Sequence, residues 1–286
     1  MHLSISCLAL TKSISIRAKR MPQIGRLLAV VAVTLLAACS TPGPSGAGLS
    51  IPINTDIVST AQDSRVKIVV LHYTAANKQR SLDLLSGPSV SSHYLITDEN
   101  PPQLYQLVDE NRRAWHAGVS EWYGRPHVND VSIGIEIVNA GGSPGNWASY
   151  SPEQIQLLID LLRDIVERHE IKPENIVGHS DIAPQRKLDP GPRFPWVQLA
   201  QAGLGRWPEP TLSAHFQAQF EADGLPDVQW VQERLEQLGY PIEKTGQWDK
   251  QSQNVLAAFQ MHYRPARYDG QLDAETAGLL KALGYD

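Results

Sequence analysis

The stretch GHSDIAPQRKLDPGPRFPW, residues 178–196, places His179 and Asp189 ten residues apart in a loop that four prolines stiffen. A short apolar strand is predicted just before it, so His179 follows the end of a strand. Another candidate, His72, closes the apolar run KIVVLHYT at 67–74. Because neighbouring strand ends can present side chains to one point, we expect His72, His179 and Asp189 to meet.

Two imidazoles and one carboxylate are a ligand set that holds a catalytic zinc ion while leaving a fourth position open for water. A structural zinc site is closed by four protein ligands, usually rich in thiolates, and this chain has only two cysteines, Cys7 and Cys39. Magnesium and calcium prefer oxygen ligands alone. A single histidine after a strand is more often an ordinary polar residue than a ligand. The prediction of one zinc ion per chain therefore depends on the three residues together.

Two charged residues are candidates for the chemistry beside the metal. Glu136 lies in the apolar strand SIGIEIVN (132–139), on the face opposite its three isoleucines. A carboxylate there can take a proton from water and pass it to a leaving amine. Lys187, two residues before Asp189, can stabilise an oxyanion. The alternative for both is a surface charge pair, which stabilises a fold by less than about 1 kcal/mol.

The N-terminus has the pattern of an export signal. Lys19, Arg20 and Arg26 precede an uncharged run, 27–38, that is short for a membrane span and suits a signal peptide. The run ends in Leu-Ala-Ala-Cys, which resembles a bacterial lipobox cut before Cys39. We expect a signal peptide at 1–38, lipid on Cys39 and a flexible tether at 39–56. An uncleaved anchor helix is the alternative.

Charge and cysteine content narrow the function classes. The whole chain has 25 basic and 30 acidic residues, and cleavage after residue 38 would remove five basic residues and no acidic ones. The remaining formal charge of −10 makes nucleic acid a poor partner, since such binding needs a positive surface. Cleavage and lipidation would leave no cysteine pair for an intrachain disulfide, so packed cores must stabilise the fold.

The pattern of the first domain, 57–205, predicts an α/β fold with a mixed central β-sheet flanked by helices. Strands are predicted at 66–71, 93–97, 103–108 and 132–138, with a short one at 175–178 that leads His179 into a loop. A helix is predicted at 152–169, with Ser151 as N-cap and Gln154 closing a capping box. The prolines of GLGRWPEPTLS (203–213) predict an interdomain linker at 206–214.

The C-terminal segment, 215–286, contains an internal repeat. Gly-Gln-Trp-Asp at 246–249 recurs as Gly-Gln-Leu-Asp at 270–273, each before a helical pattern. Asp249 and Asp273 are natural N-caps, and three apolar stripes predict a small three-helix domain. If this domain folds separately and binds a ligand, truncation near residue 210 should impair that binding. It should spare catalysis by the first domain on small soluble substrates.

Together the segments resemble the amidase-2 family of zinc-dependent N-acetylmuramoyl-L-alanine amidases, whose domain is shared with peptidoglycan-recognition proteins. The resemblance covers about 140 residues and is strongest to the outer-membrane lipoprotein members. The matching pieces, in the family's order, are LHYT (71–74), SSHYLI (91–96), AWHAG (114–118), SIGIEIVN (132–139), GHSDIAP (178–184) and RKLDPGPRFPW (186–196). The C-terminal segment resembles the peptidoglycan-binding type 1 domain.

The resemblance implies zinc on His72, His179 and Asp189, and substrate contacts near His116 and Asn139. It also implies Glu136 as the catalytic acid and base, with Lys187 stabilising the transition state. Phage members of the family have a catalytic tyrosine where this chain has Ser92, and they lack a carboxylate at the Glu136 position. The proton-handling role is therefore expected to fall to Glu136 here.

The expected reaction is hydrolysis of the amide between N-acetylmuramic acid, including its 1,6-anhydro form, and the L-alanine of the stem peptide, in cell-wall turnover or recycling. Peptidoglycan and muropeptides are the expected partners of a monomer anchored in the outer membrane and facing the periplasm. Ser40, where an aspartate would retain a lipoprotein in the inner membrane, favours that location. A non-catalytic wall-binding lipoprotein and a metallopeptidase that cuts within the stem peptide are the alternatives.

Overall fold

A mixed five-stranded sheet forms the centre of the first domain in the computed structural model, which describes residues 51–284. The strands are β1 (Ile68–Tyr73), β2 (Tyr94–Ile96), β3 (Leu104–Gln106), β6 (Ser132–Ile137) and β9 (Ile176–Gly178), in the order β3-β2-β6-β1-β9. The edge strand β3 runs antiparallel to β2, and the other pairings are parallel. The predicted mixed sheet is confirmed, and its inner strand β1, between β6 and β9, carries His72.

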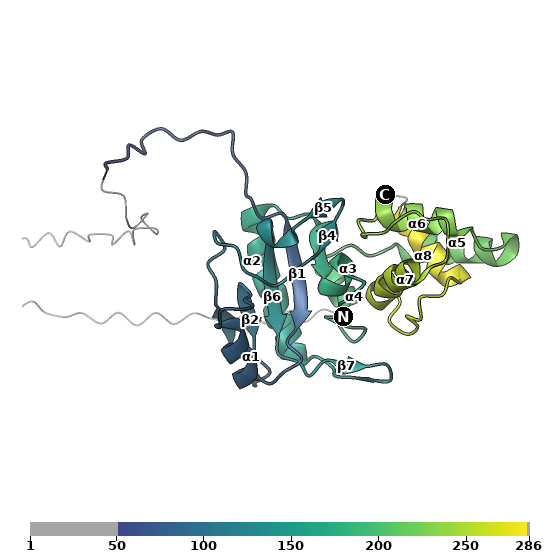
Figure 1. Ribbon diagram of the computed structural model, residues 1–286, viewed down its shortest axis with the longest axis horizontal. Coiled ribbons are helices and arrows are strands. Elements are labelled where there is room, and N and C mark those ends of the chain that lie inside the picture. Colours follow the sequence, from purple (N-terminus) through teal and green to yellow (C-terminus); the bar gives the residue numbers. More distant parts are fainter. Residues whose placement is uncertain (1–50, 285–286) are drawn as a thin grey trace, which may run out of the picture. The chain divides into compact units, whose positions relative to one another are not determined.

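The two sides of the sheet are covered by different helices. The helices of this domain are α1 (Lys78–Leu85), α2 (Pro152–His169), α3 (His179–Ile182) and α4 (Trp196–Gln201). Helix α2 packs on the side of Val69, Leu71 and the three isoleucines of β6, whereas α3 lies on the side of Ile68 and Val70 (Figure 1). Two small hairpins and two 3-10 turns connect these elements. The hairpins are β4–β5 (Glu121–Trp122, Arg125–Pro126) and β7–β8 (Gly142–Ser143, Asn146–Trp147), and the turns are Val128–Asp130 and Pro173–Asn175.

Local sequence determines the longest helix, α2. Its N-cap Ser151 accepts a hydrogen bond from the Gln154 backbone N–H, and the Gln154 side chain accepts one from the Ser151 N–H. The predicted capping box and helix bounds are therefore confirmed. The prediction that His179 lies in a loop is wrong, because His179 is the first residue of α3. The Asp181 carboxylate accepts a hydrogen bond from the Gly178 N–H at 2.7 Å and so closes the first turn of this helix.

The C-terminal segment contains the three predicted helices, α6 (Val228–Gln237), α7 (Lys250–Tyr263) and α8 (Ala274–Leu283), capped by Asp227, Asp249 and Asp273. A helix that the sequence analysis missed, α5 (Pro210–Asp223), packs against α8. The predicted linker at 206–214 is therefore too long. Proline fits the first position of a helix, and the Glu209 side chain accepts hydrogen bonds from the Thr211 and Leu212 backbone N–H groups.

The internal repeat is visible in the hydrogen bonds of two buried glutamines. Gln232 donates to the Gln247 carbonyl and accepts from the Gly246 N–H. Gln260 makes the same pair of hydrogen bonds, to the Gln271 carbonyl and from the Gly270 N–H. Each glutamine thereby fixes one copy of the Gly-Gln-x-Asp turn to the preceding helix.

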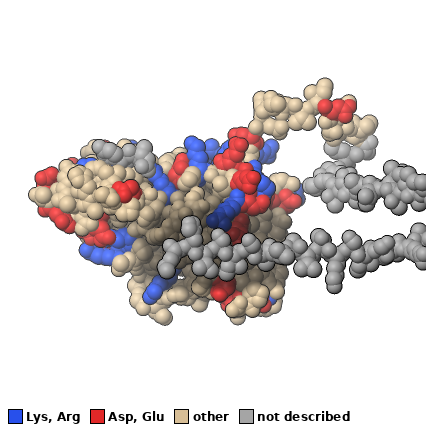
Figure 2. Space-filling view, turned by 180° about the vertical axis from the view of Figure 1, so that it is seen from behind, with Lys and Arg blue, Asp and Glu red and all other residues tan. Residues whose placement is uncertain are grey.

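Residues 59–284 belong to one compact unit, which does not include residues 51–58. Residues 51–58 are exposed and have no helix or strand. The predicted signal peptide, Cys39 and most of the predicted tether lie outside the described residues. Within 51–284, no helix is long and apolar enough to cross a membrane. On the face shown in Figure 2, lysines and arginines are interspersed with aspartates and glutamates.

Candidate active site

His72, His179 and Asp189 converge at the carboxyl ends of β1 and β9. These strands are parallel neighbours, and the pair Leu71 and Gly178 is in register, so the two histidines that follow lie side by side. The Ser180 backbone N–H donates to the Asp189 carbonyl at 2.8 Å, which brings the loop back to the sheet. All three side chains are buried. The meeting predicted from the sequence is confirmed.

The three candidate ligand atoms form a tight triangle. His72 Nδ1 lies 3.0 Å from His179 Nδ1 and 2.9 Å from Asp189 Oδ2, and His179 Nδ1 lies 3.1 Å from Asp189 Oδ2. A tetrahedron built on zinc-ligand bonds of 2.0–2.1 Å has edges of about 3.3 Å. In the described part of the chain, this is the one group of three such residues that could hold a metal ion.

Hydrogen bonds on the far side of His72 determine which of its two ring nitrogens carries the proton. The other nitrogen then directs a lone pair toward the triangle. The Ser132 hydroxyl donates its only proton to the Val128 carbonyl at 2.7 Å, so its oxygen must accept from His116 Nε2, 3.1 Å away. His116 Nδ1 is then an acceptor for the proton on His72 Nε2, at 3.0 Å. This series of hydrogen bonds leaves His72 Nδ1 unprotonated. Burial, reinforced by the neighbouring His179, lowers the pKa of His72 to about 4.

His179 also has its proton on Nε2 and its lone pair on Nδ1. Its Nε2 lies 3.0 Å from the Ala117 carbonyl, which can only accept, so His179 Nδ1 also presents a lone pair. Two imidazole lone pairs and a carboxylate oxygen therefore face one another at about 3 Å. Such a cluster is repulsive unless a cation lies between its members, and neutral imidazoles with an ionised carboxylate are the forms that bind metals. The residues present fit a metal ion, and their N₂O donor set suits zinc.

The triangle opens on a pocket of about 400 Å³ that Glu136 and Lys187 also line. Glu136 pairs in register with His72, so both side chains lie on the same face of the sheet. Its Oε2 atom is buried without a hydrogen-bond partner. Burial raises the pKa of Glu136 well above its usual range, and the Asp189 carboxylate adds to that rise. Glu136 is therefore a carboxyl group that is poised to hold a proton.

The two residues expected to contact substrate have other partners. His116 lines the pocket, but both of its ring nitrogens are engaged, with His72 and Ser132. Asn139 accepts from the Gly141 N–H at 2.8 Å and donates to the Ser149 carbonyl at 3.1 Å. The geometry gives His116 a role in orienting His72 and gives Asn139 a role in holding a loop. Their expected contacts with substrate stay predictions.

Sequence reasoning missed three residues that support the ligands. Ser132 sets the proton direction described above. A Cβ atom on Gly134 would lie 2.4 Å from the His116 ring, so only glycine lets that ring pack on β6. Arg186 donates to the Ala117 carbonyl, the same group that orients His179, and to the Val119 carbonyl. A glycine inside an apolar strand was the available signal, since it often marks a close approach.

The rim of the pocket is apolar. Trp115 and Leu188, about half exposed, and the less exposed Val90 and Leu84 line the pocket. Large hydrophobic side chains at the mouth of a polar site are suited to contact the nonpolar faces of a ligand.

Comparison with known proteins agrees with this geometry. Residues 62–192 match the family described as N-acetylmuramoyl-L-alanine amidase, and residues 224–285 match a family described as a putative peptidoglycan binding domain. The chain is 42% identical over 264 residues to N-acetylmuramoyl-L-alanine amidase AmiD of Escherichia coli, covering 89% of this chain and 95% of that protein.

Two solved structures are similar over most of the chain. AmpDH3 of Pseudomonas aeruginosa superposes with a TM-score of 0.76 at 41% identity, covering 82% of this chain and 98% of that one. AmiD of E. coli, in complex with the substrate anhydro-N-acetylmuramic acid-L-Ala-D-gamma-Glu-L-Lys, gives a TM-score of 0.72 at 42% identity, with coverages of 82% and 96%. The triangle of candidate metal ligands, its acidic neighbour and these similarities agree, and the chain belongs to the family of N-acetylmuramoyl-L-alanine amidases.

Proposed function

We propose that this chain hydrolyses the amide between N-acetylmuramic acid and the L-alanine of peptidoglycan stem peptides, with one zinc ion on His72, His179 and Asp189. The observation that carries the proposal is the set of three converging lone pairs beside the unpartnered Glu136 carboxyl group. The similar AmiD structure holds an anhydro-N-acetylmuramic acid peptide as its substrate. We extend the substrates to both the ordinary and the 1,6-anhydro sugar.

A zinc ion bound there would act as a Lewis acid toward the scissile carbonyl and favour ionisation of water. Glu136 accepts the proton of the attacking water and passes it to the nitrogen of L-alanine as the C–N bond breaks. Lys187 stabilises the negative charge that develops on the carbonyl oxygen. The products are a muramic acid carboxylate and a peptide with a free L-alanine amine.

A non-catalytic wall-binding protein is the competing function, and the two are separated by zinc content and product mass. The purified protein should contain one zinc ion per chain, lose activity on chelation and regain it with zinc. His72→Ala, His179→Ala and Asp189→Ala should each lower zinc occupancy and release of the peptide. His215→Ala, which alters an exposed histidine of α5 far from the ligands in sequence, is the control. Full zinc content and full turnover in Asp189→Ala would refute this coordination.

We also propose that the protein is a monomeric outer-membrane lipoprotein facing the periplasm, tethered through Cys39. The Leu-Ala-Ala-Cys sequence at 36–39 and Ser40 support this location. Membrane fractionation of the wild type and of Cys39→Ala tests it, and sedimentation measures the oligomeric state. A Cys39→Ala protein that still sediments with outer membranes would contradict the lipid anchor.

A further inference from the structure

The ligand loop, defined as residues 178–191 with the short helix α3 near its start, carries His179, Lys187 and Asp189 and is held from two sides. One side is the sheet of the first domain, through β9. The other side is the C-terminal segment, which contacts this ligand loop at Asp181 and at Gln185. The second set of contacts joins a segment that matches a wall-binding family to the residues proposed to hold the metal.

Asp181 is the centre of the first contact. Its carboxylate is fully buried and accepts a hydrogen bond from the backbone N–H of Gly178, the residue directly before His179. The C-terminal segment supplies two further donors to this carboxylate. The Tyr240 hydroxyl donates to Oδ1 at 2.9 Å, and His262 Nδ1 donates to Oδ2 at 2.8 Å.

The two donors to Asp181 are themselves fixed in place. The His262 ring is stacked between Trp196, at 3.7 Å between ring centroids, and Tyr263, at 4.2 Å. Tyr240 is buried and makes edge contacts with Trp122 and Phe259. These packed rings cannot reorient freely, so they determine where the Asp181 carboxylate lies.

The second contact lies two residues before Lys187. The Asn254 side chain of α7 donates to Gln185 Oε1 at 2.9 Å, and Gln185 Nε2 donates to the Gln251 carbonyl at 3.1 Å. Between the two contacts, Ile182 and Ala183 pack in one hydrophobic cluster with side chains from α6, α7 and α8. Helix α7 therefore lies along the ligand loop over several residues.

We infer that the C-terminal domain positions the metal site, with Tyr240 and His262 acting through Asp181 on the turn that carries His179. The inference rests on the proposed function of that site. Removal of the Tyr240 hydroxyl leaves Asp181 Oδ1 without a partner, and removal of the His262 ring takes away one of the two donors to Oδ2. A buried carboxylate that loses donors recovers hydrogen bonds by moving or by admitting water. Either response loosens the Gly178–Asp181 turn, and the His179 Nδ1 atom loses its fixed direction.

The test compares variants of the full chain whose fold is verified by circular dichroism and thermal unfolding. His262→Ala should weaken zinc affinity, measured by chelator competition, by about tenfold or more, as for other outer-shell partners of ligands. Tyr240→Phe, which keeps the packing, should weaken it by roughly threefold to tenfold. His262→Asn, whose amide can replace the Nδ1 donor, should restore part of the loss.

Gln260→Ala is the matched control, because Gln260 is a buried residue of the same helix whose hydrogen bonds stay within the C-terminal domain. It should lower the unfolding temperature and leave zinc affinity unchanged. A metal-free readout is amide hydrogen exchange at Gly178 and Ser180, which should accelerate in His262→Ala and Tyr240→Phe but not in Gln260→Ala.

Three results would overturn the inference: unchanged zinc affinity in folded His262→Ala and Tyr240→Phe, an equal loss in Gln260→Ala, or unchanged exchange at Gly178 and Ser180. Zinc content and turnover of the wild type test the proposed function separately. The exchange data retain their meaning even if the wild type binds no zinc.

Discussion

At the scale of single residues, the state of a side chain depends on which hydrogen-bond partners it has. His72, His116 and Ser132 form a chain in which each proton position follows from the Ser132 bond to the Val128 carbonyl. Glu136, on the same face of the sheet, has an oxygen without any partner. An unsatisfied buried carboxyl group costs stability, and such groups are concentrated at functional sites.

Glu136→Gln tests the proton-transfer role. The amide has nearly the same shape but cannot accept the proton of the attacking water. We expect zinc content and unfolding temperature close to those of the wild type, with a fall in kcat of about 10²- to 10⁴-fold. Turnover is measured by release of the peptide from a soluble muropeptide.

Glu167→Gln, at an exposed position of α2, is the control for loss of one negative charge. Its turnover should match the wild type. If Glu136→Gln were also near normal, the general base would have to be another group.

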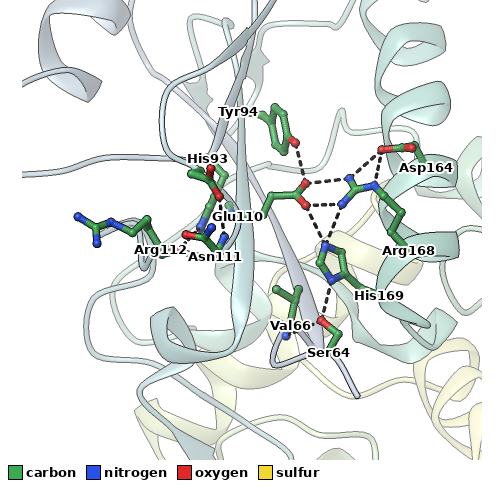
Figure 3. Close-up of polar contacts among 12 residues, drawn as sticks. Ser64, Val66, His93, Tyr94, Glu110, Asn111, Arg112, Asp164, Arg168 and His169 are labelled. Atoms are coloured by element: carbon green, nitrogen blue, oxygen red, sulfur yellow. Dashed lines mark hydrogen bonds and ion pairs between the residues drawn. The ribbon is translucent and has the colours of Figure 1, made fainter. Parts of the chain in front are cut away.

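At the scale of elements, one partly buried carboxylate connects three parts of the first domain (Figure 3). Glu110, in the loop after β3, accepts from Tyr94 of β2 and from Arg168 and His169 at the end of α2. His169 in turn bonds to Ser64, just before β1. Burial opposes ionisation of Glu110, but these hydrogen bonds outweigh it and lower its pKa to about 2.

This network predicts an acid-dependent loss of stability. A carboxyl group whose pKa is 4.5 unfolded and about 2 folded contributes stability above pH 4.5 and loses it as the pH falls toward 2. The contribution is at most about 3 kcal/mol. The free-energy difference between wild type and Glu110→Gln, measured by urea unfolding, should therefore be largest near neutral pH and shrink below pH 4.5.

Asp164→Asn is the control, because Asp164 also bonds to Arg168 but its side chain is 61% exposed. That variant should change stability little at any pH. A Glu110→Gln difference that stays constant from pH 6 to pH 2 would contradict the role assigned to Glu110.

At the scale of the whole molecule, the two domains share a hydrophobic core. Ile182 and Ala183, close in sequence to the candidate ligand His179, cluster with Val231, Leu256 and Phe259 of the C-terminal helices. The Trp147 indole N–H also donates to the Tyr268 hydroxyl at 2.7 Å. This continuity disagrees with the sequence-based expectation of a separable module.

Truncation after Gly205 is therefore predicted to impair both catalysis and wall binding. It would expose the apolar side of α3 and leave Asp181 without two of its donors. We expect the unfolding temperature to fall by roughly 10 °C or more, and turnover of small soluble muropeptides to fall along with wall binding. Retention of full activity on the soluble substrate by a stable truncated protein would restore the separable-module interpretation.

Local patterns were sufficient where a short segment determines its own structure. The Ser151 capping box and apolar spacing gave α2 its bounds, and the Asp249 and Asp273 caps located two C-terminal helices. Proline was ambiguous, because the same residue that interrupts a chain also begins a helix. For this reason the start of α5, residues 210–214, is predicted as part of the linker.

The sequence by itself predicted the candidate ligand set, since His72 lies at the end of one apolar strand, His179 follows another, and Asp189 comes next in a proline-stiffened loop. It also placed Glu136 on the face opposite the isoleucines, because side chains alternate along a strand. Only the tertiary structure decided that Ser132, Gly134 and His116 orient His72, and that Tyr240 and His262 reach Asp181. Those contacts join residues that are separated in the chain. The local spacing of residues does not show which distant donor will form a hydrogen bond with a buried acceptor.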